Sequence, residues 1–114
     1  MRVVYGIPQC DKVRKARRWL DEQQLAYQFH DYKKSGVDVE LLKSWIDRFG
    51  WEQVINRRGT SWRRLPEAQR QAMGAEAAMV AAIDNPSLIK RPILMDGELC
   101  LLGFDIDAWQ EALL

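Results

Sequence analysis

A short apolar strand that runs through a turn into a strongly amphipathic helix is the feature that most limits the fold of this chain. Val3-Val4-Tyr5 is a β-branched and aromatic run, and Gly6-Ile7-Pro8 stops it. Residues 11–24 are good helix formers with apolar side chains at helical spacing and a charged opposite face. Alternation over residues 26–32 predicts a second strand, parallel to the first through a right-handed crossover. The chain is therefore predicted to begin with a β-α-β unit.

The middle of the chain is predicted to be helical. Asp38 is a suitable N-cap for a helix with apolar residues at i, i+3, i+4 and i+7, and Gly50 ends it. Glycine and proline divide the following residues into short helical pieces over residues 51–55, 66–73 and 75–83.

Two apolar runs then flank Asp96-Gly97, a strong sequence signal for a two-residue hairpin turn. With Asp96 and Gly97 in the turn, Ile93 would face Cys100 across the hairpin. Cys100 is then expected to be buried and structural.

Asp105 is expected to cap a last helix that turns Ile106, Trp109 and Leu113 inward. The resulting order is β-α-β, a helical block, a β-hairpin and a closing helix. This order is typical of an α/β thioredoxin-like fold with a helical insertion between its halves. With 114 residues, we expect one such domain over residues 1–114 and an insertion at about residues 37–89.

Composition excludes several classes of function. The 17 Lys and Arg nearly balance the 16 Asp and Glu, so bulk charge favours neither nucleic acid nor an anionic membrane as a partner. No apolar run approaches the roughly 18 residues of a membrane span, and no secretory segment is evident, so a cytoplasmic location is expected. One His and two distant Cys offer no metal cluster.

Cys10 lies where the first strand has ended and the first helix begins. Unpaired backbone N–H groups at a helix start favour an anion, and Lys12 and Arg14 would add positive charge. A reactive thiolate is therefore expected, the alternative being a cysteine that only fills the turn. Because Val13 occupies the position of a second cysteine in a CxxC pair, the resolving thiol must come from outside, and glutathione is the simplest candidate.

Three spaced motifs carry a family resemblance. They are Gly6-Ile7-Pro8-Gln9-Cys10-Asp11-Lys12-Val13-Arg14-Lys15-Ala16, Asn56-Arg57-Arg58-Gly59-Thr60-Ser61-Trp62-Arg63 and Lys90-Arg91-Pro92-Ile93-Leu94. Together they resemble the ArsC/Spx family of arsenate reductase-like proteins, specifically its YffB-like branch. The resemblance spans nearly the whole chain and implies a thioredoxin-like fold with a helical insertion.

The resemblance also implies roles for individual residues. Cys10 matches the cysteine that attacks the oxyanion in the arsenate reductases, where glutathione and glutaredoxin resolve the adduct. Arg91 matches one oxyanion-binding arginine, and either Arg57 or Arg58 matches another; a guanidinium suits carboxylates and oxyanions because it forms paired hydrogen bonds. Pro92 matches the cis-proline that lies beside the reactive cysteine. Arg57 and Arg58, with Arg63 and Arg64, could alternatively form a solvated basic face.

One departure from the family pattern sets the order of the functional hypotheses. Arsenate reductases of the family usually carry a further arginine just past the glycine that follows the last strand, whereas here Phe104 and Asp105 follow Gly103. Replacing a cation with a carboxylate near an oxyanion should cost about 2 kcal/mol or more of arsenate binding. A glutathione-dependent thiol-disulfide oxidoreductase is therefore the first hypothesis, and arsenate reduction with glutathione and glutaredoxin is the second. A Spx-like regulator that binds RNA polymerase ranks third, because the CxxC switch is absent.

Overall fold

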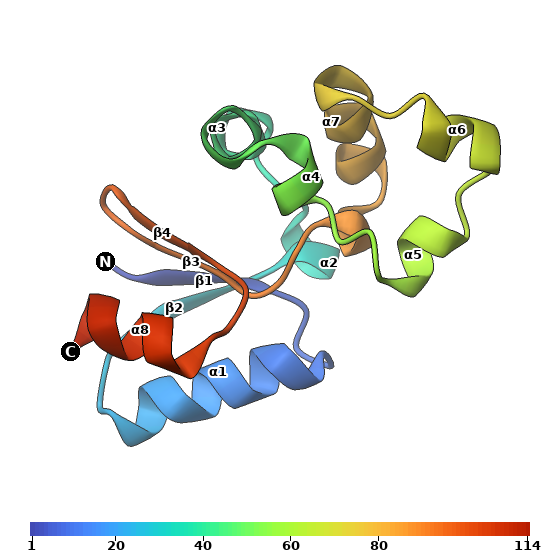
Figure 1. The fold of residues 1–114 in the computed structure, drawn as a ribbon. Coiled ribbons are helices and arrows are strands. Elements are labelled where there is room, and N and C mark those ends of the chain that lie inside the picture. Colours follow the sequence, from blue (N-terminus) through green and yellow to red (C-terminus); the bar gives the residue numbers. More distant parts are fainter. The chain divides into compact units, whose positions relative to one another are not determined.

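A four-stranded sheet with strand order β2-β1-β3-β4 forms the centre of one of two compact units in the chain (Figure 1). The computed structural model describes all 114 residues. Its strands are β1 (Val3–Gly6), β2 (Gln28–Asp31), β3 (Ile93–Asp96) and β4 (Leu99–Leu102). β1 pairs parallel to β2 and antiparallel to β3. The predicted β-α-β start and the C-terminal hairpin are both confirmed.

The hairpin turn differs from the predicted one. Asp96 pairs with Leu99 across the hairpin, so the turn residues are Gly97 and Glu98 and the prediction of Asp96-Gly97 is wrong. Gly97 has φ +61°, which glycine adopts without a steric penalty. Asp96 instead extends β3 by one residue.

This shift changes the partner of Cys100 but not its face. Cys100 faces Met95, and Ile93 faces Leu102, so the predicted pairing of Ile93 with Cys100 is also wrong. The observed register differs from the predicted one by two residues, and side chains along a strand alternate between its two faces with period two. Cys100 therefore stays on the predicted face and is buried, with 8% of its surface exposed.

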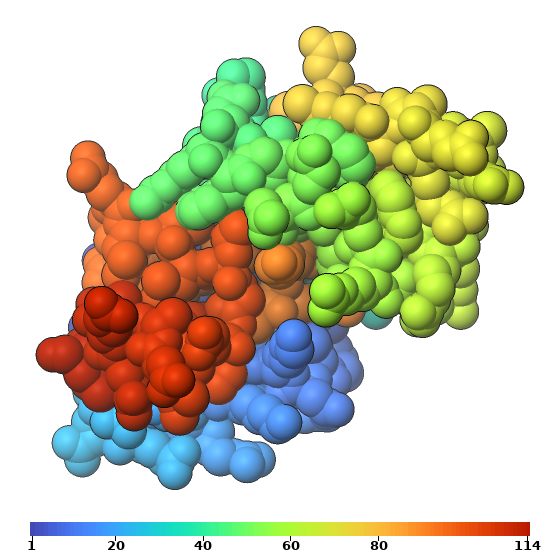
Figure 2. Space-filling model, in the orientation of Figure 1, coloured from blue at the N-terminus to red at the C-terminus, as the bar shows by residue number.

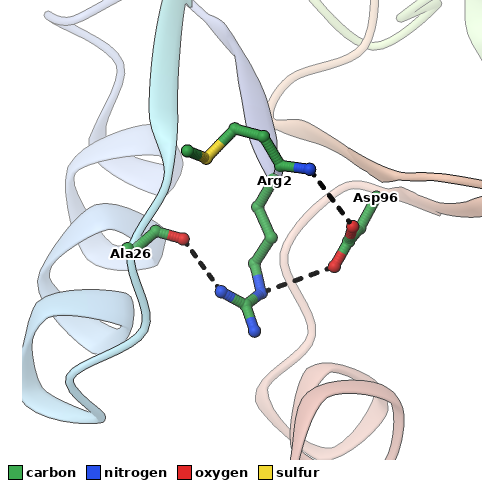
Figure 3. Close-up of polar contacts among 4 residues, drawn as sticks. Arg2, Ala26 and Asp96 are labelled. Atoms are coloured by element: carbon green, nitrogen blue, oxygen red, sulfur yellow. Dashed lines mark hydrogen bonds and ion pairs between the residues drawn. The ribbon is translucent and has the colours of Figure 1, made fainter.

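Charged groups join three segments where β1 begins (Figure 3). The guanidinium of Arg2 donates to the carbonyl oxygen of Ala26 at 2.9 Å, and its Nε lies 3.7 Å from the carboxylate of Asp96. The amino group of Met1 lies 3.9 Å from the same carboxylate. These contacts give Asp96 a role that favours its place in the strand over a place in the turn.

Two helices cover one face of this sheet (Figure 1). They are α1 (Asp11–Glu22) and α8 (Ile106–Leu113). Their buried core with the sheet consists of Val4, Ala16, Trp19, Leu20, Leu94 and Trp109. The indole rings of Trp19 and Trp109 meet edge to face, with centroids 6.2 Å apart, a favourable aromatic geometry.

The N-cap of α8 is confirmed, but one of its predicted core residues is wrong. The carboxylate of Asp105 accepts a hydrogen bond from the backbone N–H of Asp107 at 3.1 Å. Trp109 is 1% exposed, whereas Ile106 is 46% exposed. Phe104, just before the helix, packs against the Trp109 ring at 4.9 Å and supplies apolar contact at this end of the helix.

The second compact unit spans Tyr32–Lys90 and is helical. It contains α2 (Tyr32–Ser35), α3 (Val39–Phe49), α4 (Trp51–Val54), α5 (Thr60–Arg63), α6 (Glu67–Gln71), α7 (Ala75–Asp84) and the 3-10 helix η1 (Pro86–Leu88). As predicted, Asp38 caps α3 by accepting from the N–H of Glu40, and Gly50 ends it with φ +85°. The short elements α2, α5 and η1 were not predicted, because single turns leave little periodicity. None of the helices is both long and apolar enough to span a bilayer.

Candidate active site

Cys10 is the N-cap residue of α1. Its backbone N–H donates to the carbonyl of Ile7 at 3.1 Å, and its carbonyl accepts the first helical hydrogen bond from Arg14 at 2.9 Å. Its side chain makes no capping hydrogen bond, and the residue is half-buried. The sulfur is thus held at a helix start without being used to stabilise the helix.

The structure changes the expectation that Lys12 and Arg14 both add positive charge beside Cys10. The guanidinium of Arg14 forms an ion pair with the carboxylate of Asp11, one turn back on the same helix. This carboxylate compensates much of the positive charge that Arg14 would bring to an anion at Cys10. Lys12 is exposed and has no ion pair, which leaves it as the uncompensated cation of the first turn.

A second turn lies at the same end of the sheet as Cys10. Tyr5 pairs with Ile93, so the end of β1 lies beside the start of β3. The peptide bond between Arg91 and Pro92, just before β3, is cis as expected. A Cβ atom built on Gly6 would lie 3.7 Å from Cβ of Arg91. The structure therefore brings the Cys10 turn and the Arg91–Pro92 turn to one sheet end.

Gly6 and Gly103 also contribute to the packing at this end of the sheet. Neither was among the predicted site residues. A Cβ on Gly6 would lie 2.8 Å from Cγ2 of Val13, so only glycine lets the strand approach α1 this closely. The N–H of Gly103 donates to the carbonyl of Pro92 at 2.8 Å, and its carbonyl accepts from the indole of Trp109 at 3.0 Å. Both glycines lie at the end of a strand, and a glycine at such a position can indicate a close approach of the backbone to another segment.

Arg57 and Arg58 belong to the helical unit, so their part in a site at Cys10 stays a prediction. The side chain of Asn56 accepts from the N–H of Arg58 at 3.3 Å, and the carbonyl of Asn56 accepts from Gly59 at 3.4 Å. This turn presents both arginines to solvent. The guanidinium of Arg57 lies 5.6 Å from the ring centre of Trp51, a cation–π contact.

Neither cysteine is in a disulfide. Cys100 is the more buried of the two. The ring of His30 lies 5.1 Å from that of Tyr5, so it packs against an aromatic neighbour. No three Cys, His, Asp or Glu side chains come together in a way that could hold a metal ion.

The sequence pattern of the ArsC family matches residues 5–112. The chain belongs to the ArsC family. The solved structure of a YffB protein is 46% identical to this ArsC-family chain, with full coverage of both chains and a TM-score of 0.96. An arsenate reductase (ArsC) related protein from Brucella melitensis is 41% identical over 98% of this chain and 92% of its own, with a TM-score of 0.78. The predicted family, its YffB-like branch and the thioredoxin-like fold are confirmed.

Curated protein sequences are also similar to this chain. A Haemophilus influenzae protein is 38% identical over 98% of both chains. The global transcriptional regulator Spx of Streptococcus agalactiae is 29% identical over 88% of this chain and 74% of its own. The chain is thus similar to proteins with different descriptions, an arsenate reductase related protein and a transcriptional regulator.

Proposed function

We propose that this ArsC-family protein is a thiol-disulfide oxidoreductase with Cys10 as its nucleophile and glutathione as its co-substrate. The observation that carries the proposal is the placement of Cys10: the residue is half-buried at the N-cap of α1, and its side chain makes no capping hydrogen bond. Because the sulfur is not engaged in the helix cap, it is available to attack a disulfide, and the thiolate is the form that reacts.

The proposed reaction is three successive thiol-disulfide exchanges. The Cys10 thiolate attacks one sulfur of a substrate disulfide; a new S–S bond forms, the old one breaks, and the departing sulfur leaves as a thiolate. A glutathione thiolate then attacks the mixed disulfide, displaces the substrate's second sulfur or Cys10, and a further glutathione completes the cycle. The substrate gains two electrons and two glutathione molecules become one disulfide.

The absence of an internal resolving thiol supports the need for glutathione. Val13, at the position where a CxxC pair would have its second cysteine, is fully buried in the packing of α1. Cys100 is buried in the hairpin, opposite Met95. Both features favour a thiol that arrives from solution, and glutaredoxin is a candidate partner for releasing a glutathione adduct.

We assign substrate and glutathione binding to residues around this cysteine. Arg91 and one of Arg57 or Arg58 would bind glutathione carboxylates through charge-assisted hydrogen bonds, each contributing roughly 1.5 to 3 kcal/mol. Lys12 would contribute positive charge in the first turn, with Arg14 secondary because Asp11 engages it. Pro92 would line the same sheet end.

Arsenate reduction remains the second hypothesis. The position just past Gly103, where an oxyanion-binding arginine would be expected, is taken by Phe104 and Asp105. Phe104 packs on Trp109, and the carboxylate of Asp105 caps α8. These two residues therefore build the helix and its core, which leaves no cation at this position. A Spx-like regulatory role ranks below both, because the CxxC pair is missing.

Mass spectrometry after incubation with glutathione disulfide tests the main proposal. The wild type and Cys100→Ser should each gain one glutathione, and Cys10→Ser should gain none. An adduct that persists in Cys10→Ser would contradict the proposal. Coupled turnover with arsenate, glutathione and glutaredoxin tests the alternative; turnover above background would reverse the ranking.

The arginine assignments need separate variants. Arg91→Ala should raise the KM for glutathione about tenfold or more, whereas Arg91→Lys should recover only part of the loss because lysine lacks the planar fork. Comparing Arg57→Ala with Arg58→Ala identifies which of the two binds. If neither affects KM, the solvated basic face is the correct interpretation.

A further inference from the structure

Positive charge is concentrated on one helix of a chain that is nearly neutral overall. The formal net charge of the whole sequence is +1. Residues 12–18 of α1 nevertheless carry five cations and no acidic residue: Lys12, Arg14, Lys15, Arg17 and Arg18. Such a local excess requires an explanation that bulk composition does not provide.

Two of these five cations have partners within the protein. Arg14 forms the ion pair with Asp11. The guanidinium of Arg17 lies 4.1 Å from the ring centre of Phe29, and its Nε donates to the hydroxyl of Tyr27 at 3.1 Å. The Arg17 contacts connect α1 to the β2 segment, whereas the Arg14 ion pair lies within α1.

The other three cations are exposed and have no ion pair in the structure. We call them the α1 cation stripe: Lys12, Lys15 and Arg18. Their i, i+3, i+6 spacing places them along one side of the helix over about 9 Å. Figure 2 shows the blue atoms of the segment that contains α1 at the molecular surface.

The helix presents this stripe rigidly. Its opposite side is buried against the sheet, with Val13, Ala16 and Leu20 each 0% exposed. The stripe begins in the first turn, directly after the N-cap Cys10. A partner bound along it would therefore be aligned with the reactive sulfur.

Glutathione alone does not account for the stripe. Along the helix axis, Lys15 and Arg18 lie about 7.5 Å and 12 Å from Cys10. A tripeptide spans about 10 Å when fully extended, and glutathione would be attached through its central residue, so each arm reaches only part of that length. One such arm is shorter than the stripe, so a single glutathione would not contact all three cations.

We propose that the α1 cation stripe docks an acidic protein surface next to the disulfide that Cys10 attacks. This inference rests on the proposed function and specifies its substrate class as acidic protein disulfides. A protein rather than a nucleic acid is favoured because the chemistry beside the stripe requires a sulfur. Opposite charges steer encounter and raise association rates by tenfold or more at low salt.

Activated peptide disulfides test the docking directly. Three peptides each carry one cysteine in a disulfide with thionitrobenzoate, flanked by glutamates, lysines or serines. Attack by Cys10 on the peptide sulfur forms the new S–S bond and releases coloured thionitrobenzoate as a thiolate, with the thiol proton lost to solvent. Cys10→Ser provides the blank.

The expected result is a preference that depends on charge and position. At low salt the wild type should react about tenfold faster with the acidic than with the basic peptide, and the ratio should fall toward one near 1 M salt, where screening is strong. Lys15→Gln/Arg18→Gln should lower the ratio severalfold while leaving the rate with uncharged iodoacetamide unchanged.

A matched control separates position from net charge. Gln110→Glu/Ala112→Glu changes the net charge by the same amount on exposed positions of α8 and should leave the ratio unchanged. Equal loss in both double variants, or a wild-type ratio of one at low salt, would overturn the docking proposal. If Cys10 fails to react with glutathione disulfide but keeps its peptide preference, the proposed co-substrate fails instead.

A second copy of this chain is the alternative partner that could bind the α1 cation stripe. Asp107 and Glu111 are exposed on α8, which has no cation. Analytical ultracentrifugation of the wild type and of Lys15→Gln/Arg18→Gln distinguishes a second copy from an acidic protein partner. A wild-type dimer that the double variant dissociates would overturn the proposal, and a monomer in both cases would support it.

Discussion

A Cβ atom on Gly6 would lie 2.8 Å from Cγ2 of Val13, which is closer than two non-bonded carbon atoms normally approach. Gly6 ends β1 and Val13 is in the first turn and a half of α1, so this pair sets how closely the strand and the helix around Cys10 approach each other. Val13 is 0% exposed, so it cannot move away into solvent.

Gly6→Ala should therefore lower the free energy of unfolding by about 1 to 3 kcal/mol, as overpacking usually does. Urea unfolding measures the effect. Gly6→Ala/Val13→Ala should be less destabilised than the sum of the two single variants, because removing the Val13 methyl groups relieves the contact. Additive single effects would show that the contact is not the cause.

The ion pair between Asp11 and Arg14 should control how Cys10 reacts with charged reagents. Asp11→Asn leaves the Arg14 charge uncompensated and should raise the rate with anionic iodoacetate, relative to neutral iodoacetamide, by about twofold for a charge roughly 8 Å away in water. Glu22→Gln removes an equal charge at the far end of the same helix and serves as the control. An identical rate ratio in both variants would contradict this role.

The two cysteines should differ in reactivity in the folded protein. Cys10 is half-buried at a helix start, whereas Cys100 is 8% exposed within the hairpin. Iodoacetamide should label Cys10 faster by on the order of tenfold or more, because Cys100 must wait for local opening. Mass spectrometry of timed samples gives both rates. The difference should largely disappear in urea, and equal rates in native buffer would refute the expected burial.

The carboxylate of Asp105 should stabilise the last helix. Asp105→Ala removes the acceptor for the N–H of Asp107 and should cost about 1 kcal/mol. Asp105→Asn keeps a side-chain oxygen and should retain most of that stability. Thermal unfolding of the two variants compares them, and equal losses would show that the hydrogen bond contributes nothing.

Local signals in the sequence predicted most of the architecture. The caps at Asp38 and Asp105 and the helix end at Gly50 depend on residues close in sequence, so the pattern was sufficient. The apolar side of α1 followed from helical spacing alone. The i, i+3 spacing of Asp11 and Arg14 also favours their ion pair, which the expectation of added positive charge from Arg14 did not include.

Contacts between segments that are distant in sequence determined the features that local sequence patterns did not predict. Asp96-Gly97 and Gly97-Glu98 are both acceptable turns, and the observed choice accompanies the contact of Asp96 with Arg2 near the start of the chain. The exposure of Ile106 likewise follows a packing arrangement in which Phe104 meets Trp109.

Gly103 links the end of the chain to the turn before β3. Its N–H bonds to Pro92 and its carbonyl to the indole of Trp109, so one residue joins α8 to the Arg91–Pro92 turn. Truncating the chain within α8, or attaching a tag that frays it, would remove the anchor for Trp109 and loosen that turn. The C-terminal helix, remote from Cys10 in sequence, thereby anchors the turn that lies at the same end of the sheet as Cys10.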